Sequence, residues 1–204
     1  MKDVPSSAHT VRGDTVAADA CSDDVLLKRF AEGDALAARL LTDRLGPRCY
    51  SVALRMLNNT AEAEDVTQEA MLRLWKVAAD WVPGQAKIST WLYRVVLNLC
   101  VDLRRKKTAG ALDDVPEPED DQPSVVDRMQ QNARVDALQA ALAQLPERQR
   151  EAVILRHIEE LSNPEIAGIM RISVEAVESL VARGKRSLTA ILSGRQEELG
   201  YDHV

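Results

Sequence analysis

The sequence predicts an all-α fold made of two small helical domains joined by an acidic, flexible linker. Three observations lead to this prediction. Apolar residues recur every three or four positions through most of the 204-residue chain, as on helices that bury one face. No stretch shows the sustained polar and apolar alternation of a strand. A segment rich in proline and acidic residues separates two helical halves.

These patterns divide the chain into five segments. Residues 1–21 are expected to form a disordered tail, and residues 22–107 a first helical domain. Residues 108–133 hold seven acidic residues against one basic residue, a composition that buries too little apolar surface to fold and predicts a mobile linker. A second helical domain is expected over 134–192, followed by a tail over 193–204.

The first domain is predicted to contain four helices. Ser22 is placed to cap a helix that runs to about Glu32. A second helical segment follows, in which Gly46 and Pro47 should break or kink the chain. Thr60 begins the third helix, whose apolar residues again repeat at helical spacing.

The fourth helix, within residues 90–107, carries a polar ridge opposite its apolar face. Arg94, Asn98 and Asp102 fall in one line on that ridge, and four cations follow at 104–107. Asparagine is mildly unfavourable inside a helix, and this ridge can donate and accept hydrogen bonds toward a base edge. A solvated helix face is the alternative explanation, and these residues alone leave both open.

Aromatic residues gather around the loop before this helix. Trp75, Trp81, Trp91 and Tyr93 are four of the seven aromatic residues in the chain. Aromatic rings beside cations can stack on unpaired bases, although tryptophans on amphipathic helices more often fill a core. We expect Trp75 to lie in the core and Trp81, in a loop with proline and glycine, to be available for function.

The second domain is predicted to contain a helix-turn-helix. A stripe of apolar residues ends at Pro146, and a helix follows over Glu147–His157. Ser162 and Glu165 fit a capping box, and the three residues 171–173 form a tight turn. Such units lay their second helix in the DNA major groove, although a packing unit with solvated charges is the alternative. The exposed face of that helix should present Glu175, Glu178, Ser179, Ala182, Arg183 and Arg186.

Charge limits what this second domain can do alone. The chain has a net charge of −6, and residues 134–204 hold nine basic against eleven acidic residues. Because phosphate neutralisation supplies most of the affinity for DNA, this half should bind DNA weakly without a partner.

Other function classes lack the residues that they require. Cys21, Cys49 and Cys100 are far apart, with no histidine spaced to complete a metal site, so we expect neither a metal nor a disulfide scaffold. The three histidines, without a phosphate-binding glycine loop or a nucleophile beside a base, argue against an enzyme and against a cofactor. No segment is apolar enough for export or membrane insertion, so we expect a cytoplasmic protein.

Two segments resemble a known family. AEAEDVTQEAMLRLW, with the aromatic loop and STWLYRVVLNLCVDLRRK after it, resembles region two of bacterial sigma factors of the extracytoplasmic-function group. LPERQREAVILRHIEELSNPEIAGIMRISVEAVESLVARGKRSL resembles region four of the same group. Their order along the chain, with an acidic linker between them, agrees with the same family.

The resemblance implies a dissociable subunit that gives RNA polymerase core its promoter specificity. Members bind the clamp helices of the polymerase, and many are held inactive by an anti-sigma factor that contacts both domains. The residues that match the core-binding motif are Asp65, Gln68, Glu69 and Arg73. Those implied in minus-ten recognition and melting are Trp81, Lys87, Trp91, Arg94, Asn98, Asp102, Arg104 and Arg105. Those implied at the minus-thirty-five element are the six exposed residues named above together with Arg148 and Arg156.

The chain also departs from the family pattern. Family members often carry glycine where this chain has Arg171, and lysine or arginine where it has Glu178 and Leu180. These differences suggest an unusual promoter preference. The alternative function is a helix-turn-helix transcription regulator whose first half senses a signal and which does not replace the sigma subunit.

Overall fold

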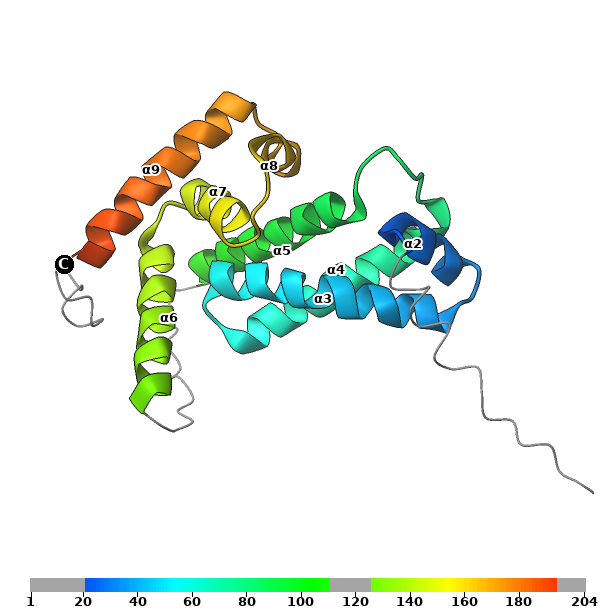
Figure 1. The fold of residues 1–204 in the computed structure, drawn as a ribbon, viewed down its shortest axis with the longest axis horizontal. Coiled ribbons are helices and arrows are strands. Elements are labelled where there is room, and N and C mark those ends of the chain that lie inside the picture. Colours follow the sequence, from blue (N-terminus) through cyan, green and yellow to red (C-terminus); the bar gives the residue numbers. More distant parts are fainter. Residues whose placement is uncertain (1–20, 111–125, 194–204) are drawn as a thin grey trace, which may run out of the picture.

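The computed structural model describes residues 21–110 and 126–193, and all of its regular elements in these ranges are helices (Figure 1). The predicted all-α fold is therefore confirmed. Most of the predicted linker 108–133 and of the predicted tails 1–21 and 193–204 lies outside the described residues.

The first half contains four α-helices and one short 3₁₀ turn. They are α2 (Asp23–Ala31), α3 (Ala35–Leu57), α4 (Thr60–Val77), η1 (Ala78–Asp80) and α5 (Ile88–Gly110). In Figure 1, α3, α4 and α5 lie side by side along the long axis, and α2 covers one end. This is the predicted four-helix domain.

Side chains cap the starts of these helices, as the sequence predicts for the first. Ser22 accepts a hydrogen bond from the backbone N–H of Val25 at 3.4 Å. Asp34 accepts from the first turn of α3, and Asn59 does the same for α4. These bonds satisfy backbone donors that have no partner within a helix. Asn58, with φ 55°, ends α3 in the left-handed conformation.

Of the break or kink expected at Gly46 and Pro47, the break is wrong, because α3 continues through both residues. Proline removes one helical hydrogen bond and crowds the preceding turn. Pro47 is exposed, and so is Asp43, whose carbonyl loses its helical partner. Leu45 and Cys49, on either side of it, are buried and hold the helix against the core. Burial of that apolar face offsets the local cost.

The core of this half is formed where α3, α4 and α5 meet. Leu41, Leu74, Leu92 and Val96 are at most 1% exposed. Trp75, which we expected in the core, is half-buried and packs against this cluster, with its ring centroid 4.6 Å from that of Phe30. Burial of these apolar side chains is the main force that holds the four helices together.

The second half contains α6 (Val126–Gln144), α7 (Glu147–His157), α8 (Asn163–Met170) and α9 (Val174–Ser193). Helix α6 begins within the range 108–133 assigned to the linker, and its first turns include Arg128, Met129 and Gln130, which are good helix formers. Helix α5 likewise extends to Gly110.

The predicted helix-turn-helix is present. The carboxylate of Glu165 accepts from the backbone N–H and the hydroxyl of Ser162 at 3.0 and 2.8 Å, which completes the capping box. Residues 171–173 connect α8 to α9, and Arg171 adopts the left-handed conformation with φ 54°. Ser173 accepts from the N–H of Ala176 in the first turn of α9.

A close approach fixes α9 against α7. A Cβ atom placed on Gly184 would lie 2.5 Å from Cγ2 of Val153 and 3.2 Å from the carbonyl oxygen of Gln149. Only glycine lets the two backbones approach this closely. The direction in which α9 leaves the turn is therefore set by this contact as well as by its cap.

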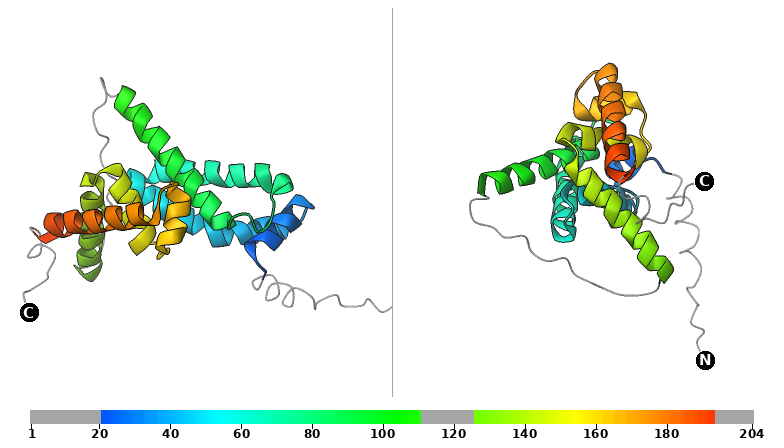
Figure 2. Two further views of the ribbon diagram at one scale, coloured as in Figure 1. Left: turned by 90° about the horizontal axis from the view of Figure 1, so that it is seen from above. Right: turned by 90° about the vertical axis from the view of Figure 1, so that its left-hand side faces the viewer.

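The two halves pack against each other. Helix α8 contacts α5, while α6 and α7 contact α3, so the second half lies on one end and one face of the first (Figure 2). Gln139 Nε2 donates to the carbonyl oxygen of Leu54 at 2.8 Å, and Arg150 Nη1 donates to that of Met56 at 3.0 Å. Both acceptors lie at the C-terminal end of α3; Leu54 also accepts from the backbone N–H of Asn58, whereas Met56 is among the last carbonyls, which have no partner within the helix.

Candidate nucleic-acid interface

The polar ridge of α5 is partly covered by α8. Arg94 is half-buried, and its Nη2 and Nε donate to the carbonyl oxygens of Gly168 and Ile169 at 2.5 and 3.4 Å. These carbonyls lie in the last turn of α8, where the helix dipole favours a cation. Asn98 and Asp102 are exposed. The structure therefore gives the ridge two accessible residues and one that binds the other half.

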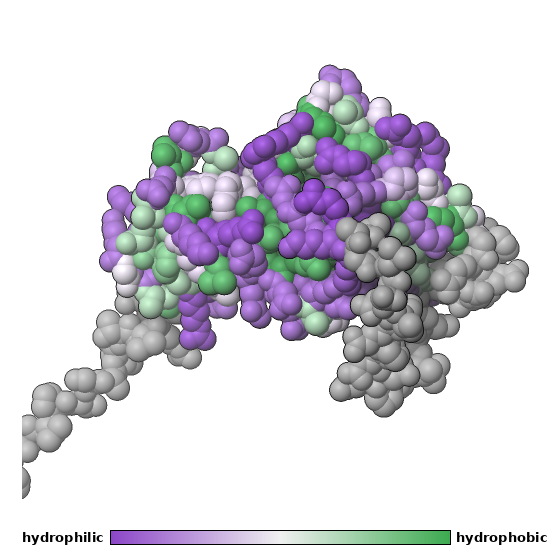
Figure 3. Space-filling model, turned by 180° about the vertical axis from the view of Figure 1, so that it is seen from behind, coloured by the Kyte–Doolittle hydropathy of each residue, from purple (hydrophilic) through white to green (hydrophobic). Residues whose placement is uncertain are grey.

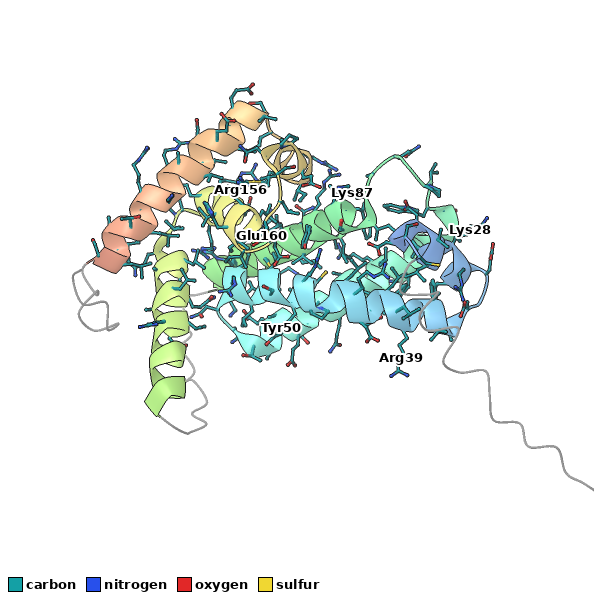
Figure 4. The ribbon with its side chains drawn as sticks, viewed as in Figure 1. Lys28, Arg39, Tyr50, Lys87, Arg156 and Glu160 are labelled. Carbon is teal, nitrogen blue, oxygen red and sulfur yellow. The ribbon has the colours of Figure 1, made fainter. Side chains whose placement is uncertain are left out.

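Cations at both ends of α5 face the second half. Lys87 Nζ lies 2.7 Å from Oε1 of Glu165, and Arg104 Nη1 lies 3.8 Å from Oε2 of Glu147. Figure 4 shows Lys87 at the start of α5, on the side of α8. The pKa of Glu165 is lowered to about 2, first by the Lys87 hydrogen bond and then by those from Ser162. These bonds all favour the carboxylate form.

The aromatic residues near the loop contact the rest of the protein. Trp81 Nε1 donates to Asp24 on α2 at 2.8 Å, and its ring meets the edge of Trp91 with centroids 6.0 Å apart. Both rings remain half-buried rather than covered. Tyr93 is buried, and its hydroxyl donates to Glu159 of the second half at 2.7 Å. Burial, with the neighbouring carboxylate, raises the pKa of Tyr93.

Helix α9 presents the predicted face to solvent. The six exposed residues on that face are Glu175, Glu178, Ser179, Ala182, Arg183 and Arg186. The pKa of Glu175 is lowered by its own backbone N–H and by Ser173, as suits an acid at a helix N-terminus. Acids therefore lie at the start of the exposed face and arginines farther along it.

The two arginines expected to contact phosphate differ in position. Arg148 is exposed, but its guanidinium is held in place, because Nη1 donates to Glu151 at 2.8 Å and Nη2 to the carbonyl oxygen of Met170 at 3.1 Å. Arg156 is exposed, and a single bond links it to the carbonyl oxygen of Leu161 at 2.9 Å. Arg156 therefore has fewer internal hydrogen bonds to break than Arg148 before it could contact phosphate.

The outer face of α4 combines charged, amide and apolar side chains. Asp65 and Gln68 are exposed, and Glu69 accepts from Arg73 at 2.8 Å. The Arg73 hydrogen bond lowers the pKa of Glu69. Leu72 is 52% exposed on the same face, one turn after Gln68. The sequence interpretation missed Leu72, although its spacing places it beside the predicted polar residues.

Two buried charged residues were also missed. Arg150 and Glu151 are 3% and 2% exposed. Burial raises the pKa of Glu151 and lowers that of Arg150 to about 10. Arg150 precedes buried Ile154 by four residues, so helical spacing alone places it on the inner face.

The described residues bring together no group of three or more metal-ligating side chains. None of the helices in the described ranges is long and apolar enough to cross a membrane. On the face seen from behind, hydrophilic residues dominate and hydrophobic residues form small separate patches (Figure 3).

Comparison with known proteins yields two family matches. Residues 41–110 match Sigma-70 region 2, and residues 136–188 match Sigma-70, region 4. The chain is 33% identical over 180 residues to the ECF RNA polymerase sigma factor SigW of Bacillus subtilis (strain 168), covering 79% of this chain and 92% of that one. It is 30% identical over 193 residues to the RNA polymerase sigma factor NccH of Alcaligenes xylosoxydans xylosoxydans, covering 87% and 98%.

A solved structure of CnrH in complex with the cytosolic domain of CnrY is also similar. The TM-score is 0.65 at 26% sequence identity, and the match covers 84% of this chain and 97% of CnrH. The sigma factor RpoE from Bartonella quintana, solved with the anti-sigma factor NepR, shares the fold at a TM-score of 0.61 and 20% identity, over 76% of this chain and 96% of that one.

Proposed function

The chain belongs to the extracytoplasmic-function group of sigma-70 factors, and from this premise we propose which of its surfaces bind polymerase and which bind promoter DNA. The protein is an alternative sigma factor that binds RNA polymerase core and directs promoter-specific initiation. We assign it no catalytic activity of its own, and place its action in the cytoplasm with the polymerase. Residues 22–107 serve as region two and residues 134–192 as region four.

The outer face of α4 is the proposed polymerase-binding surface. Asp65 and Gln68 project into solvent, and the Glu69–Arg73 pair lies beside them. An acidic and amide surface suits a basic helical partner. Leu72 adds an exposed apolar side chain to the same face, and its burial on binding would contribute affinity.

The ridge of α5 and the aromatic loop form the proposed minus-ten surface. Asn98 and Asp102 hold an extruded base, while Arg94, Arg104, Arg105 and Lys87 contact the strand. Trp81 and Trp91 form a half-exposed aromatic pair next to them. Extruding a base costs a few kcal/mol, and this cost must be offset by contacts at the minus-ten surface and by polymerase binding.

The exposed face of α9 is the proposed minus-thirty-five surface. Arg183 and Arg186 are positioned for phosphate or guanine contacts, and Glu175 and Glu178 for cytosine amines. Arg156 is a proposed phosphate contact. Arg148 could serve in this way only after leaving Glu151 and Met170.

The observation that carries the proposal is the position of Arg94. Its Nε and Nη2 are bonded to the last turn of α8, so these two donors are not available to a promoter strand while the halves are packed together. We propose that the compact arrangement is an inactive form. Polymerase binding would separate the two halves and release the ridge.

An anti-sigma factor is the proposed regulator. The similar structure of CnrH is a complex with the cytosolic domain of CnrY. Because the compact arrangement already engages Arg94 without any partner, an inhibitor that binds both halves needs only to stabilise that arrangement. Binding one of two states more tightly shifts the population toward that state.

Run-off transcription with purified core polymerase on a promoter library tests the proposal. The protein should direct initiation from a subset of promoters, and changing Asp65, Gln68 and Glu69 together to alanine should abolish both transcription and capture of core. Asp43→Ala, which removes an exposed carboxylate of α3, is the matched control and should retain both. Tight binding to specific operators without any capture of core would instead support the helix-turn-helix regulator.

A further inference from the structure

A cavity of about 200 Å³ lies between the two halves, beside the polar ridge of α5. Arg94 and Asn98 line it from α5, Arg148 from α7 and Arg171 from the turn before α9. Three guanidinium groups from three separate elements thus border one cavity. A water molecule in the liquid occupies about 30 Å³, so an ion with several oxygen atoms fits this space.

The carboxylates at the cavity do not neutralise all of these cations. Glu151 accepts from Arg148 at 2.8 Å, and Glu147 lies 3.8 Å from Arg104. Within the described part of the chain, neither Arg94 nor Arg171 has a carboxylate within 4.0 Å of its guanidinium. The pKa of Arg94 is lowered by burial and by the positive charge of Arg171. Two like charges therefore face the same space.

The backbone of Arg171 supports a role for its side chain. Its φ of 54° lies in the left-handed region, which costs free energy for any residue with a Cβ atom. Glycine would adopt this helix-ending conformation at lower cost, so the Arg171 side chain is accommodated at some cost in stability. The Arg171 guanidinium makes no hydrogen bond or ion pair with the other described residues, so no internal contact explains its presence.

We propose that this cavity binds a phosphate dianion, as free inorganic phosphate or as the phosphate group of a nucleotide. Arg94 and Arg171 neutralise the charge, and the amide of Asn98 donates a further hydrogen bond. Guanidinium groups match phosphate geometry and bind it through paired N–H donors. Because the donors come from both halves, a bound phosphate holds the halves together. If the proposed function is right, phosphate also competes with the promoter strand for Arg94.

Thermal unfolding of the full chain tests this proposal without polymerase or DNA. The midpoint should rise saturably with sodium phosphate, compared with sodium chloride at the same pH and ionic strength. At ten times the half-saturating concentration, the unfolding equilibrium constant should fall about 11-fold. A parallel titration with adenosine monophosphate identifies the source, because the natural form of the ligand should act at the lower concentration.

Arg171→Gly is the decisive variant, since it removes the guanidinium and relieves the left-handed backbone. It should fold at least as stably as the parent and lose the phosphate response. Glu160→Gly is the matched control, because Glu160 is exposed and has φ 55° but does not line the cavity. It should keep the full response.

An equal response to phosphate in Arg171→Gly, or an equal effect of chloride on the parent, would overturn the proposal. Such a result would leave the sigma-factor function intact, because no transcription enters the measurement. Conversely, failure in run-off transcription would not remove a phosphate response that depends on Arg171.

Discussion

Arg150 offers the sharpest test of how the two halves are held together. It is 3% exposed, and its guanidinium donates to four backbone carbonyl oxygens. Three acceptors lie at the C-terminal end of α6, where Leu142, Ala143 and Leu145 accept at 2.7, 2.5 and 3.1 Å. The fourth is Met56 at the end of α3, at 3.0 Å. One side chain thus caps the C-terminal ends of two helices, α6 and α3, that belong to different halves.

Arg150→Met keeps the apolar stem of the side chain and removes its charge and donors. Charge-assisted hydrogen bonds contribute at least about 1.5 kcal/mol each, so four contribute about 6 kcal/mol. Burial lowers the pKa of Arg150 from 12.5 to about 10. At about 1.4 kcal/mol per pKa unit, burial and the nearby positive charge of Arg104 together cost about 3 kcal/mol. Methionine removes both contributions, so the free energy of unfolding should fall by about 3 kcal/mol.

Urea denaturation followed by tryptophan fluorescence measures this loss, and the melting temperature should fall by about 6–12 °C. Arg156→Met is the matched control, because Arg156 lies on the same helix, is exposed and donates to a single carbonyl. Its effect should stay within about 1 kcal/mol. If both variants lose the same stability, or if Arg150→Met loses less than about 1 kcal/mol, the account of the buried guanidinium is incorrect.

Three further measurements test other parts of the structure. Gly184→Ala should destabilise the fold by about 1–3 kcal/mol in urea denaturation, because the added methyl overlaps α7; a neutral effect would mean that α9 can move away freely. The pKa of Glu165 is lowered from 4.5 to about 2, so its contribution to the free energy of unfolding is present above pH 4.5 and is lost as the pH falls toward 2. Glu165→Gln should flatten that part of the curve of stability against pH. An unchanged curve would contradict the contact with Lys87. Burial raises the pKa values of Cys49 and Cys100 to about 12, so both should react with a thiol reagent only after denaturation; rapid labelling of either in the native protein would show that its burial is incorrect.

The sequence predicted the features that depend on neighbouring residues. Ser22, the capping box of Ser162 and Glu165, and the turn at 171–173 all follow from contacts within one or two helical turns. The exposed face of α9 follows from helical periodicity in the same way. Pro47 is the exception, because burial of the surrounding apolar face outweighed a local preference to break the helix.

Contacts between residues distant in sequence were decided only by the tertiary structure. Trp81 looked available in its loop, yet it reaches Asp24 on α2. Arg94 looked free on its ridge, yet it donates to a carbonyl oxygen in the last turn of α8, in the other half. Arg150, on α7, donates to a carbonyl oxygen at the end of α3. Periodicity assigns a side chain to the inside or the outside of its own helix. Periodicity does not identify the distant carbonyl or carboxylate that bonds to this side chain, because the packing of the helices determines that partner.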